Sequence, residues 1–196
     1  MLEFIIFSII FAPIILAYLL GSIPTASIIS KLRGVDILKT GSGNPGFTNT
    51  WRQLGFFWAV PVLIVDFAKG YIACQLDEPA EDLWWVLPIA VLLGHVFPVF
   101  NKFKGGKGTA TSLGIIAAIF PQALPWVIAV FLAIFLTKRI MSLSVLVSAF
   151  IFPFIVALNY NNGNKLNLAI FICTFLFITH WKNILRLMDG EEKKIW

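Results

Sequence analysis

The stretch FIIFSIIFAPIILAYLLGSIPTASIIS, residues 4–30, holds 27 consecutive residues without a charged side chain. A helix needs roughly 20 apolar residues to cross a hydrocarbon layer about 30 Å thick, so this stretch is long enough to span a membrane. It is longer than the apolar region of a cleaved signal peptide and has no basic region before it. We therefore expect it to be a retained first transmembrane helix.

The rest of the chain has the same character. Of its 196 residues, 59% are hydrophobic and 13% are charged, whereas soluble domains carry about a quarter charged residues. Further candidate spans are residues 57–76, 83–100, 140–158 and 166–180. Residues 108–137 form an uncharged run of thirty, which is either one tilted crossing or two short crossings that turn at PQALP, residues 121–125. The prolines do not decide between the two, because membrane helices tolerate proline.

The basic residues favour two crossings there, because cytoplasmic loops are rich in Lys and Arg. With two crossings and an external N-terminus, thirteen of the fifteen basic residues are cytoplasmic, Lys165 is external and Lys69 lies within a span. A single crossing would place six of the thirteen outside. We therefore predict an all-α, polytopic integral membrane protein with seven transmembrane helices, an external N-terminus and a cytoplasmic C-terminus. Residues 1–196 then form a single domain, and the acidic stretch DEPAED, residues 77–82, is external.

Several classes of site are not indicated by the sequence. Cys74 and Cys173 lie within apolar runs, so no disulfide framework is expected. Cys, His and carboxylate residues do not cluster at metal-ligand spacing, and we expect no metal, no cofactor and no nucleic-acid partner. Neither His95 nor His180 is followed five positions later by Asp, as in the HxxxxD motif of common glycerolipid acyltransferases. A GxSxG sequence is also absent, so a covalent serine mechanism is not supported.

The Gly-rich and basic stretches all fall on the predicted cytoplasmic side, among them NKFKGGKG, residues 101–108. Its glycines leave backbone N–H groups unshielded, and a helix beginning at Thr109 would add the positive end of its dipole, which favours an anion. A lysine adds up to about 4 kcal/mol of attraction for a unit charge 4 Å away in a partly screened setting. We predict a phosphate site made by Lys104, Gly105, Gly106, Lys107 and Gly108.

Two alternatives to this phosphate site were weighed. A nucleotide P-loop needs Gly at position 101 and Ser or Thr at position 108, where this chain has Asn101 and Gly108, so ATP binding is disfavoured. An ordinary basic loop whose glycines simply make a turn remains open.

A second Gly-rich stretch, TGSGNPGFTN at residues 40–49, precedes Arg52. Backbone amides and small hydroxyl side chains suit phosphate or carbonyl oxygens, and Arg can bind phosphate through two parallel donors. The candidate residues are Thr40, Gly41, Ser42, Gly43, Asn44 and Arg52. The alternative is an ordinary turn, because SGNPG is also a typical turn sequence.

Two pairs of polar residues occur three positions apart. His180 and Asn183 would share one face of a continuing helix at the cytoplasmic boundary and could meet a ligand together, the alternative being an interfacial anchor. Asp66 and Lys69 lie within an apolar span, where a lone charge costs at least about 2.5–3.5 kcal/mol. We expect these two to neutralise each other, with proton-coupled transport left open. His95 is expected to pack or hydrogen-bond beneath the loop at residues 101–108.

The motifs together resemble those of the bacterial acyl-phosphate:glycerol-3-phosphate acyltransferase family, PlsY. The resemblance covers nearly the whole chain and rests on LLGSIPTA, GSGNPGFTNTWRQLG, GHVFPVFNKFKGGKGTATSLG, and HWKNI followed by GEEK. The stretch KRIMSLSVL resembles a further family segment, in which Ser142 matches while Ile140, Ser144 and Val145 depart from the pattern. HWKN also replaces an Arg-rich family sequence.

The resemblance implies acyl transfer from a fatty acyl-phosphate to the 1-hydroxyl of glycerol 3-phosphate in the bacterial cytoplasmic membrane. The products are 1-acylglycerol 3-phosphate and inorganic phosphate, and transfer is direct, at an active site on the cytoplasmic face beside the lipid bilayer. The implied catalytic residues are Ser42, Arg52, His180 and Asn183, with Ser22 and Ser142 added to the substrate-binding set. Which Gly-rich loop holds which phosphate, whether the base is His180 or a substrate phosphate, and the oligomeric state stay open.

Two other classes of protein were considered. A transporter for a phosphorylated solute would suit the apolar spans and the Asp66–Lys69 pair, but a carrier needs a site near the membrane midplane reachable from both sides. A non-catalytic scaffold predicts that Ser42→Ala and Arg52→Ala leave activity unchanged.

Overall fold

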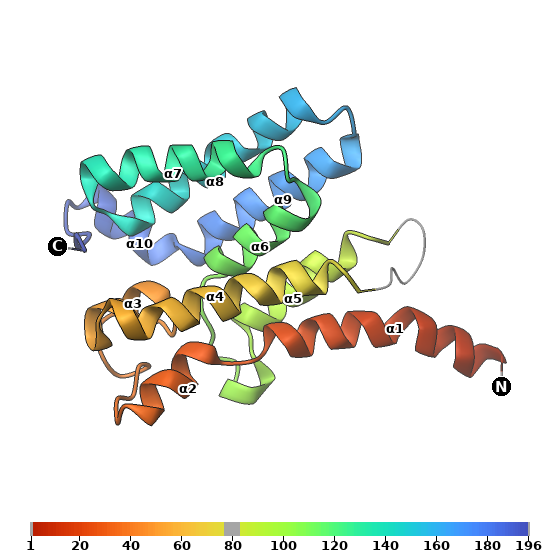
Figure 1. Ribbon diagram of the computed structural model, residues 1–196, viewed down its shortest axis with the longest axis horizontal. Helices are drawn as coiled ribbons and strands as arrows, with labels where there is room; N and C mark the ends of the chain where they lie inside the picture. Colours follow the sequence, from red (N-terminus) through yellow and green to blue (C-terminus); the bar gives the residue numbers. More distant parts are fainter. Residues whose placement is uncertain (1, 77–82, 196) are drawn as a thin grey trace. The chain divides into compact units, whose positions relative to one another are not determined.

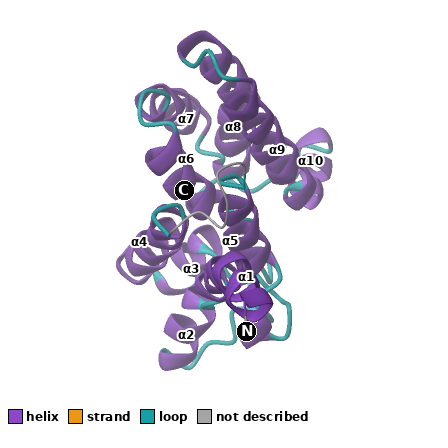
Figure 2. Cartoon of the chain, turned by 90° about the vertical axis from the view of Figure 1, so that its right-hand side faces the viewer, coloured by secondary structure: helices purple, strands orange, loops and turns teal. Residues whose placement is uncertain are grey.

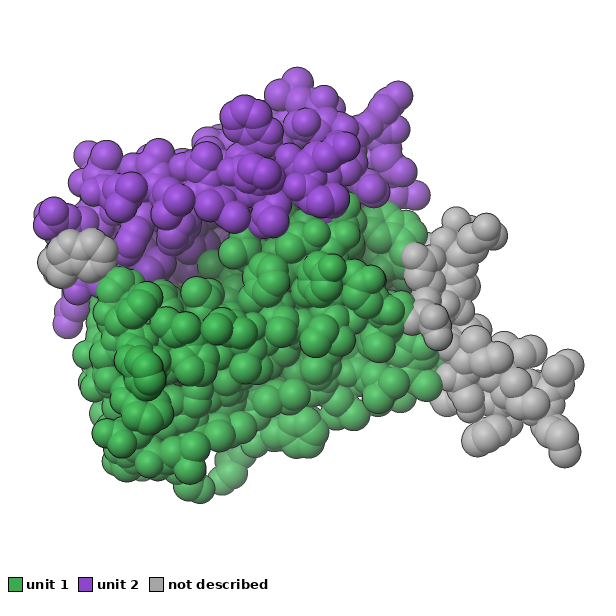
Figure 3. All heavy atoms as spheres, viewed as in Figure 1, with its two compact units in different colours: residues 1–119 green, residues 120–196 purple. Residues whose placement is uncertain are grey.

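The computed structural model describes residues 2–76 and 83–195, with side chains from residue 11 onward (Figure 1). The described residues form helices and loops and contain no strand (Figure 2). The prediction of an all-α protein is therefore confirmed for this part of the chain. The chain divides into two compact units, residues 1–119 and residues 120–196 (Figure 3). The acidic stretch at residues 77–82, predicted to be external, lies outside the described residues.

Unit 1 is built from helices that pair across glycines. Helix α1 packs on α5, and α4 packs on α6. A Cβ atom on Gly94 of α5 would overlap the carbonyl oxygen of Tyr18 in α1, and one on Gly21 would overlap the carbonyl oxygen of Val91. Small residues let helix backbones approach closely in membrane proteins. The elements of this unit are α1 (Leu2–Gly21), α2 (Thr25–Leu32), α3 (Phe47–Leu54), α4 (Phe56–Ala73), α5 (Val86–Val96), the 3₁₀ helix η1 (Val99–Asn101) and α6 (Thr109–Ile119).

The α4–α6 crossing repeats this arrangement with a second pair of glycines. A Cβ atom on Gly70 of α4 would overlap the carbonyl oxygen of Thr111, and one on Gly114 of α6 would overlap that of Phe67. Both crossings therefore bring backbone against backbone, which fixes the helices that carry the polar residues of this unit.

Unit 2 packs helices that follow each other along the chain, α7 on α8 and α8 on α9. The ring of Phe120 makes edge contacts with Phe152 and Tyr160, with ring centroids 5.2 Å and 5.6 Å apart. The last two helices are bent by 65° relative to each other. The elements are α7 (Leu124–Lys138), α8 (Met141–Asn159), α9 (Gly163–Thr179) and α10 (Trp181–Met188).

The uncharged run at residues 108–137 is not one continuous helix. Helix α6 ends at Ile119, a turn follows, and α7 begins at Leu124 with Pro125 in its first turn. Proline suits the first turn of a helix, because the N–H that it lacks has no partner there in any case. The expectation of two helices in this region is therefore confirmed. That both cross the membrane, as part of seven crossings, remains a prediction.

Many large apolar side chains of the described residues are exposed, and several polar or charged ones are buried. Exposed side chains include Phe57, Trp126 and Leu158, whereas Asp66, Lys69, His95, Ser142, His180 and Asn183 are buried. Helices or helical stretches long and apolar enough to cross a membrane are Phe11–Leu32, Phe56–Ala73 and Met141–Asn159, with α9 and α10 a fourth if the bent pair is one span; α5, α6 and α7 are shorter. This distribution is typical of a protein whose outer face meets lipid rather than water.

Candidate active site

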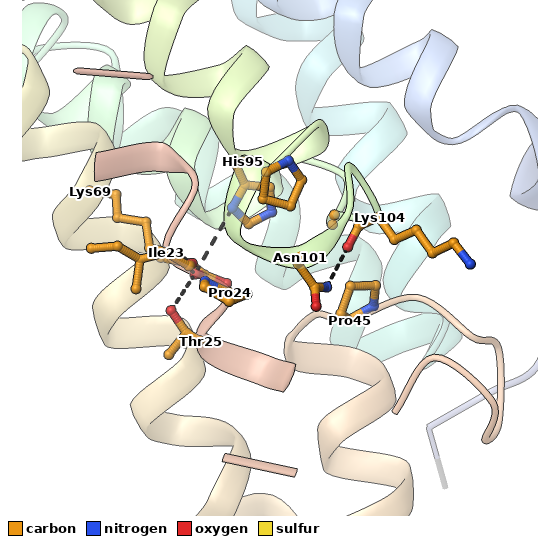
Figure 4. Close-up of a pocket in the computed structure, with 12 residues that line it drawn as sticks. Ile23, Pro24, Thr25, Pro45, Lys69, His95, Asn101 and Lys104 are labelled. Carbon is orange, nitrogen blue, oxygen red and sulfur yellow. Dashed lines mark hydrogen bonds and ion pairs between the residues drawn. The ribbon is translucent and has the colours of Figure 1, made fainter. Parts of the chain in front are cut away.

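A pocket in unit 1 is lined by both Gly-rich stretches identified in the sequence. Pro45 comes from the segment at residues 40–49, and Lys104, Gly105 and Gly106 come from the loop at residues 101–108 (Figure 4). The pocket is small and open to the surface, and its other lining residues include Thr25, Asp66, Lys69, His95 and Asn101. Two segments more than fifty residues apart in the sequence therefore reach the same pocket.

The charges that line this pocket are neutralised within the fold. Lys69 Nζ lies 2.6 Å from Asp66 Oδ1, and both side chains are almost fully buried. The hydroxyl of Thr25 donates to the same oxygen over 3.1 Å, and Lys69 also donates to the carbonyl oxygen of Ile23. The expected neutralisation of this pair is confirmed. Thr25 is the first residue of α2 and Ile23 lies two residues before it, so these hydrogen bonds also connect the N-terminal end of α2 to α4.

His95 lies directly beneath the loop at residues 101–108, as the sequence led us to expect. Its Nδ1 is 3.1 Å from Thr111 Oγ1, and its carbonyl oxygen accepts from the amide of Gly106 over 3.2 Å. A Cβ atom on Gly106 would overlap the ring nitrogen Nε2 of His95, and one on Gly105 would overlap the carbonyl oxygen of His95. Both glycines are therefore required by the close approach of the loop to α5.

The turn before these glycines is fixed by Asn101. Its side-chain amide donates to the carbonyl oxygen of Lys104 over 2.6 Å and to Ser27 Oγ over 3.1 Å. Lys102 and Phe103 both have left-handed backbone angles, with φ of 54° and 58°. The side chain of Lys104 is exposed, whereas Lys107 is half-buried. Asn101 thus holds the backbone of this turn in place, while the charged group of Lys104 stays accessible.

Helix α6 begins at Thr109, where the sequence predicted a helix N-terminus. Gly108 precedes it with φ of 82°, a left-handed angle that glycine adopts without strain. The carbonyl oxygen of Gly108 accepts from the amide of Ser112 over 2.7 Å. The positive end of the helix dipole therefore lies at the end of the Gly-rich loop.

The segment at residues 40–49 is organised by Asn49, which sequence reasoning did not single out. Its side-chain amide donates to the carbonyl oxygens of Ile37 and Thr40 over 3.2 Å and 3.0 Å. Its Oδ1 accepts from the backbone amide of Ser42 over 3.1 Å. Asn49 is 1% exposed, and a Cβ atom on Gly41 would overlap its Oδ1. One buried amide thus sets the path of the whole segment.

The predicted residues of this segment lie around that amide. Gly41 and Gly43 have positive φ angles of 60° and 69°, and Ser42 is exposed, with its Oγ 3.4 Å from the backbone amide of Asn44. The hydroxyl of Thr40 donates to the carbonyl oxygen of Asp36 over 2.9 Å. Arg52 lies in α3 and is half-buried. The pocket is lined by Pro45 of this segment and not by Ser42 or Arg52.

Ser22 occupies a packing position. It is fully buried where α1 crosses α5, and its hydroxyl donates to the carbonyl oxygen of Tyr18 over 2.9 Å. A substrate contact for Ser22 stays a prediction.

In unit 2 the structure joins Ser142 and Asn183 through Glu192, a residue that the sequence analysis quoted only within the GEEK motif. Glu192 Oε1 accepts from Ser142 Oγ over 2.9 Å and from Asn183 Nδ2 over 2.7 Å, and Oε2 accepts from Arg186 Nε over 2.6 Å. Partial burial raises the pKa of the Glu192 carboxyl, but hydrogen bonds from its three partners and the charge of Arg186 lower it by more. The pKa therefore lies below its usual value.

His180 lies at the break between α9 and α10, so the expectation that it shares one continuing helix with Asn183 is wrong. The helix stops at Thr179 and restarts at Trp181, and the amide of Asn183 donates to the carbonyl oxygen of His180 over 2.8 Å. His180 Nδ1 lies 2.8 Å from the carbonyl oxygen of Leu176. A carbonyl oxygen only accepts, so Nδ1 donates this hydrogen bond, and whenever the ring is neutral its lone pair is on Nε2.

Comparison with known proteins gives consistent matches. The model of a family described as Glycerol-3-phosphate acyltransferase matches residues 11–190. A glycerol-3-phosphate acyltransferase of Aquifex aeolicus is 42% identical over 188 residues, which cover 92% of this chain and 96% of the relative. One from Fusobacterium nucleatum is 36% identical over 189 residues, which cover 94% of this chain and 97% of the relative.

Solved structures agree with these matches. The crystal structure of PlsY (YgiH), an integral membrane glycerol 3-phosphate acyltransferase, in its glycerol 3-phosphate form is similar with a TM-score of 0.88 and 38% identity, over 93% of each chain. Its lysophosphatidic acid form gives a TM-score of 0.85 at the same identity and coverage.

Proposed function

Because the chain belongs to the glycerol-3-phosphate acyltransferase family and is therefore an acyltransferase, we propose that it transfers a fatty acyl group from an acyl phosphate to the 1-hydroxyl of glycerol 3-phosphate. The products are 1-acylglycerol 3-phosphate, which is lysophosphatidic acid, and inorganic phosphate. This reaction is the first acylation step of bacterial phospholipid synthesis. The glycerol 3-phosphate and lysophosphatidic acid forms of PlsY support it, since these molecules are an acceptor and its acylated product.

The observation that carries this proposal is the meeting of two Gly-rich segments at one pocket of unit 1. Both substrates carry a phosphate, and we assign one phosphate to each of the two Gly-rich segments that reach this pocket, the first through Pro45 and the second through Lys104, Gly105 and Gly106. Lys69 neutralises Asp66 inside the pocket, so the carboxylate does not cancel the charge of Lys104 at its rim. We assign Lys104, Gly105, Gly106, Lys107 and Gly108 to one phosphate. The segment at residues 40–49, with Arg52, is assigned to the other phosphate and to polarising the scissile carbonyl.

The chemistry needs no covalent intermediate with the enzyme. The oxygen of the 1-hydroxyl attacks the carbonyl carbon of the acyl phosphate, the bond from that carbon to the phosphate oxygen breaks, and inorganic phosphate leaves with the bonding electrons. The hydroxyl proton passes to Nε2 of His180 or to a phosphate of a substrate. An acyl phosphate is a mixed anhydride with a good leaving group, so orientation and charge stabilisation supply most of what catalysis requires.

Residues of unit 2 are assigned to the acceptor hydroxyl. His180 has the tautomer that a general base needs, with its lone pair on Nε2. Asn183 and Ser142, joined by Glu192, are assigned to orienting the hydroxyl. The support for placing these residues in the same reaction as residues 40–52 and 101–108 is the order and identity of the motifs along the chain.

The protein is a membrane protein, as its apolar helices and its similarity to an integral membrane enzyme indicate. We propose that it lies in the bacterial cytoplasmic membrane as one domain, residues 1–196, with seven crossings and an external N-terminus. The bilayer holds the acyl chain, and the active site is on the cytoplasmic face, where the basic loops gather.

Purified protein in detergent tests the donor assignment. Supplied with an acyl phosphate and glycerol 3-phosphate, it is expected to release lysophosphatidic acid and inorganic phosphate in equal amounts, and to release neither with acyl-CoA as donor. A transporter for a phosphorylated solute would form neither product. Product from acyl-CoA but not from acyl phosphate would contradict the proposal.

A pair of lysine variants tests the assignment of the loop to phosphate. Lys104→Ala is expected to lower kcat/KM by about 10²-fold, the scale seen when one donor to a developing charge is removed. Lys102→Ala, an exposed neighbour that does not line the pocket, is expected to stay within about twofold of the unchanged protein. Equal losses in the two variants would show that the loop acts through general positive charge alone.

A further inference from the structure

The buried ion pair in the pocket of unit 1 has one hydrogen-bond donor that the fold does not use. Lys69 Nζ donates to Asp66 Oδ1 over 2.6 Å and to the carbonyl oxygen of Ile23. An ammonium group has three N–H donors, and within the described residues Lys69 has no further hydrogen-bond partner. Because Lys69 lines the pocket, its third N–H is left for a ligand there.

Stability alone does not account for the charge of Lys69. The side chains of Lys69 and Asp66 are only 2% and 5% exposed. A buried ion pair is weak evidence for stability, because its desolvation penalty can exceed its Coulombic attraction. The hydrogen bond from Thr25 to Asp66 would also form with a neutral acceptor, such as the side-chain oxygen of asparagine. The charge therefore points to a role in the pocket itself.

The backbone of the loop at residues 101–108 leaves an anion in this pocket short of donors. The amide of Gly106 donates to the carbonyl oxygen of His95 over 3.2 Å, and the amide of Lys104 donates to that of Asn101 over 3.1 Å. Both N–H groups are thus satisfied within the fold. An anion there depends more on cationic side chains, whose hydrogen bonds are the stronger ones. Lys69 reaches the pocket from α4 and Lys104 reaches it from the loop (Figure 4).

We propose that Lys69 is a second cationic ligand, beside Lys104, for the phosphate assigned to residues 104–108, and that Asp66 is the positioning residue that holds its ammonium group. The pocket is small and open to the surface, so it takes one oxygen of the phosphate while the rest of the group stays at its mouth. The ion pair has no net charge, so Lys69 acts through direct contact rather than at long range. This inference rests on the proposed function, because the ligand is the phosphate of a substrate.

The test compares Asp66→Asn with the double variant Asp66→Asn/Lys69→Met. These two proteins differ at one side chain, and neither contains the carboxylate, so neither buries it without a partner. Loss of Lys69 is expected to raise the KM of one substrate, acyl phosphate or glycerol 3-phosphate, by about 10–100-fold, the scale of a hydrogen bond to a charged group. The KM of the other substrate is expected to stay within about twofold, because one phosphate lies at this pocket.

Two single variants complete the comparison. Lys69→Met leaves the carboxylate of Asp66 at the pocket, and its repulsion is expected to raise the same KM further. Lys39→Met is the control, because it removes a lysine from an ion pair of the same spacing at the surface, and it is expected to stay within about twofold of the unchanged protein. Equal KM values in Asp66→Asn and the double variant, or an equal rise in both KM values, would overturn the proposal. An effect of Lys39→Met as large as that of Lys69→Met would overturn it as well.

Binding of inorganic phosphate keeps this inference apart from the donor assignment. If the unchanged protein makes no product from acyl phosphate, the donor assignment fails, and the variants are titrated with inorganic phosphate in a calorimeter. Asp66→Asn is then expected to bind phosphate at least about tenfold more tightly than the double variant, and equal affinities would overturn the role of Lys69. If the double variant does not fold, Asp66→Asn/Lys69→Gln keeps an N–H donor for the carbonyl oxygen of Ile23 and is judged by the same ratio.

Discussion

The ring of His180 is fixed by its hydrogen bond to the carbonyl oxygen of Leu176 and by its place between two helices. An unperturbed imidazole changes its charge near neutral pH, which suits a general base. For His180 to act as a base, its lone pair must be on the ring nitrogen that does not face the backbone. A lone pair on Nδ1 would face the carbonyl oxygen of Leu176 and could not take a proton from a substrate.

Replacement of His180 tests whether the protein supplies the base. His180→Gln is expected to lower kcat by at least about 10²-fold while the KM values change little, because proton transfer contributes roughly 10²–10⁴-fold to such reactions. The measurement is the initial rate of phosphate release across a range of pH, with the exposed neighbour Lys182→Gln as control. Near-normal turnover with an unchanged pH profile in His180→Gln would assign the base to a substrate phosphate.

At the scale of the element, helices in unit 1 are positioned by glycines that face backbone atoms of the partner helix. The overlaps that a Cβ atom would make at Gly21 and Gly94 are with carbonyl oxygens, which cannot rotate away as a flexible side chain can. Helix α5 also carries His95, on which the loop at residues 101–108 lies. A change in the α1–α5 crossing is therefore expected to reach the loop.

Gly94→Ala tests this crossing. It is expected to destabilise the protein by about 1–3 kcal/mol, because an extra methyl group in a packed interface must push the helices apart. Gly163→Ala, in the first turn of α9 with open space around it, is expected to be neutral or slightly stabilising, because alanine favours helix over glycine. Melting temperatures in detergent compare the two variants. An equally small shift in both would mean that the crossing tolerates a methyl group.

Within each unit, several polar and charged groups are buried beside the hydrophobic core, and many aromatic and aliphatic side chains are exposed. In water this distribution would be unfavourable, because exposed apolar surface is not removed from solvent. In a bilayer the same surface lies in hydrocarbon, and the buried polar groups find partners within the protein. The fold thus requires the membrane as its solvent.

Labelling of single cysteines tests the proposed topology. In a background without Cys74 and Cys173, a membrane-impermeant maleimide applied to intact spheroplasts is expected to label Gln122→Cys and Asn161→Cys, and to label Lys102→Cys only after lysis. All three positions are exposed in the structure. Labelling of Lys102→Cys from outside would reverse the orientation. Protection of Gln122→Cys, with Asn161→Cys labelled, would contradict a turn outside the membrane between α6 and α7.

Several features followed from the sequence alone, because they depend on local composition and spacing. Runs without charge predicted apolar helices, and the placement of the basic residues favoured two helices in residues 108–137. The Gly-rich loop predicted a helix start at Thr109, and a separation of three residues paired Asp66 with Lys69. Each of these features depends on residues close together in the sequence. A charge is costly in hydrocarbon, and residues three apart on a helix are neighbours.

Which distant residues meet is set by the packing of the helices and loops. Pro45 and Lys104 line one pocket, Asn49 holds a segment that begins nine residues earlier, and Glu192 joins Ser142 to Asn183. The helix also breaks at His180, where a continuing helix had been expected. Such contacts depend on how helices pack and on which buried polar groups remain to be satisfied. No local pattern in the chain encodes these conditions, because each partner is supplied by a different helix or loop.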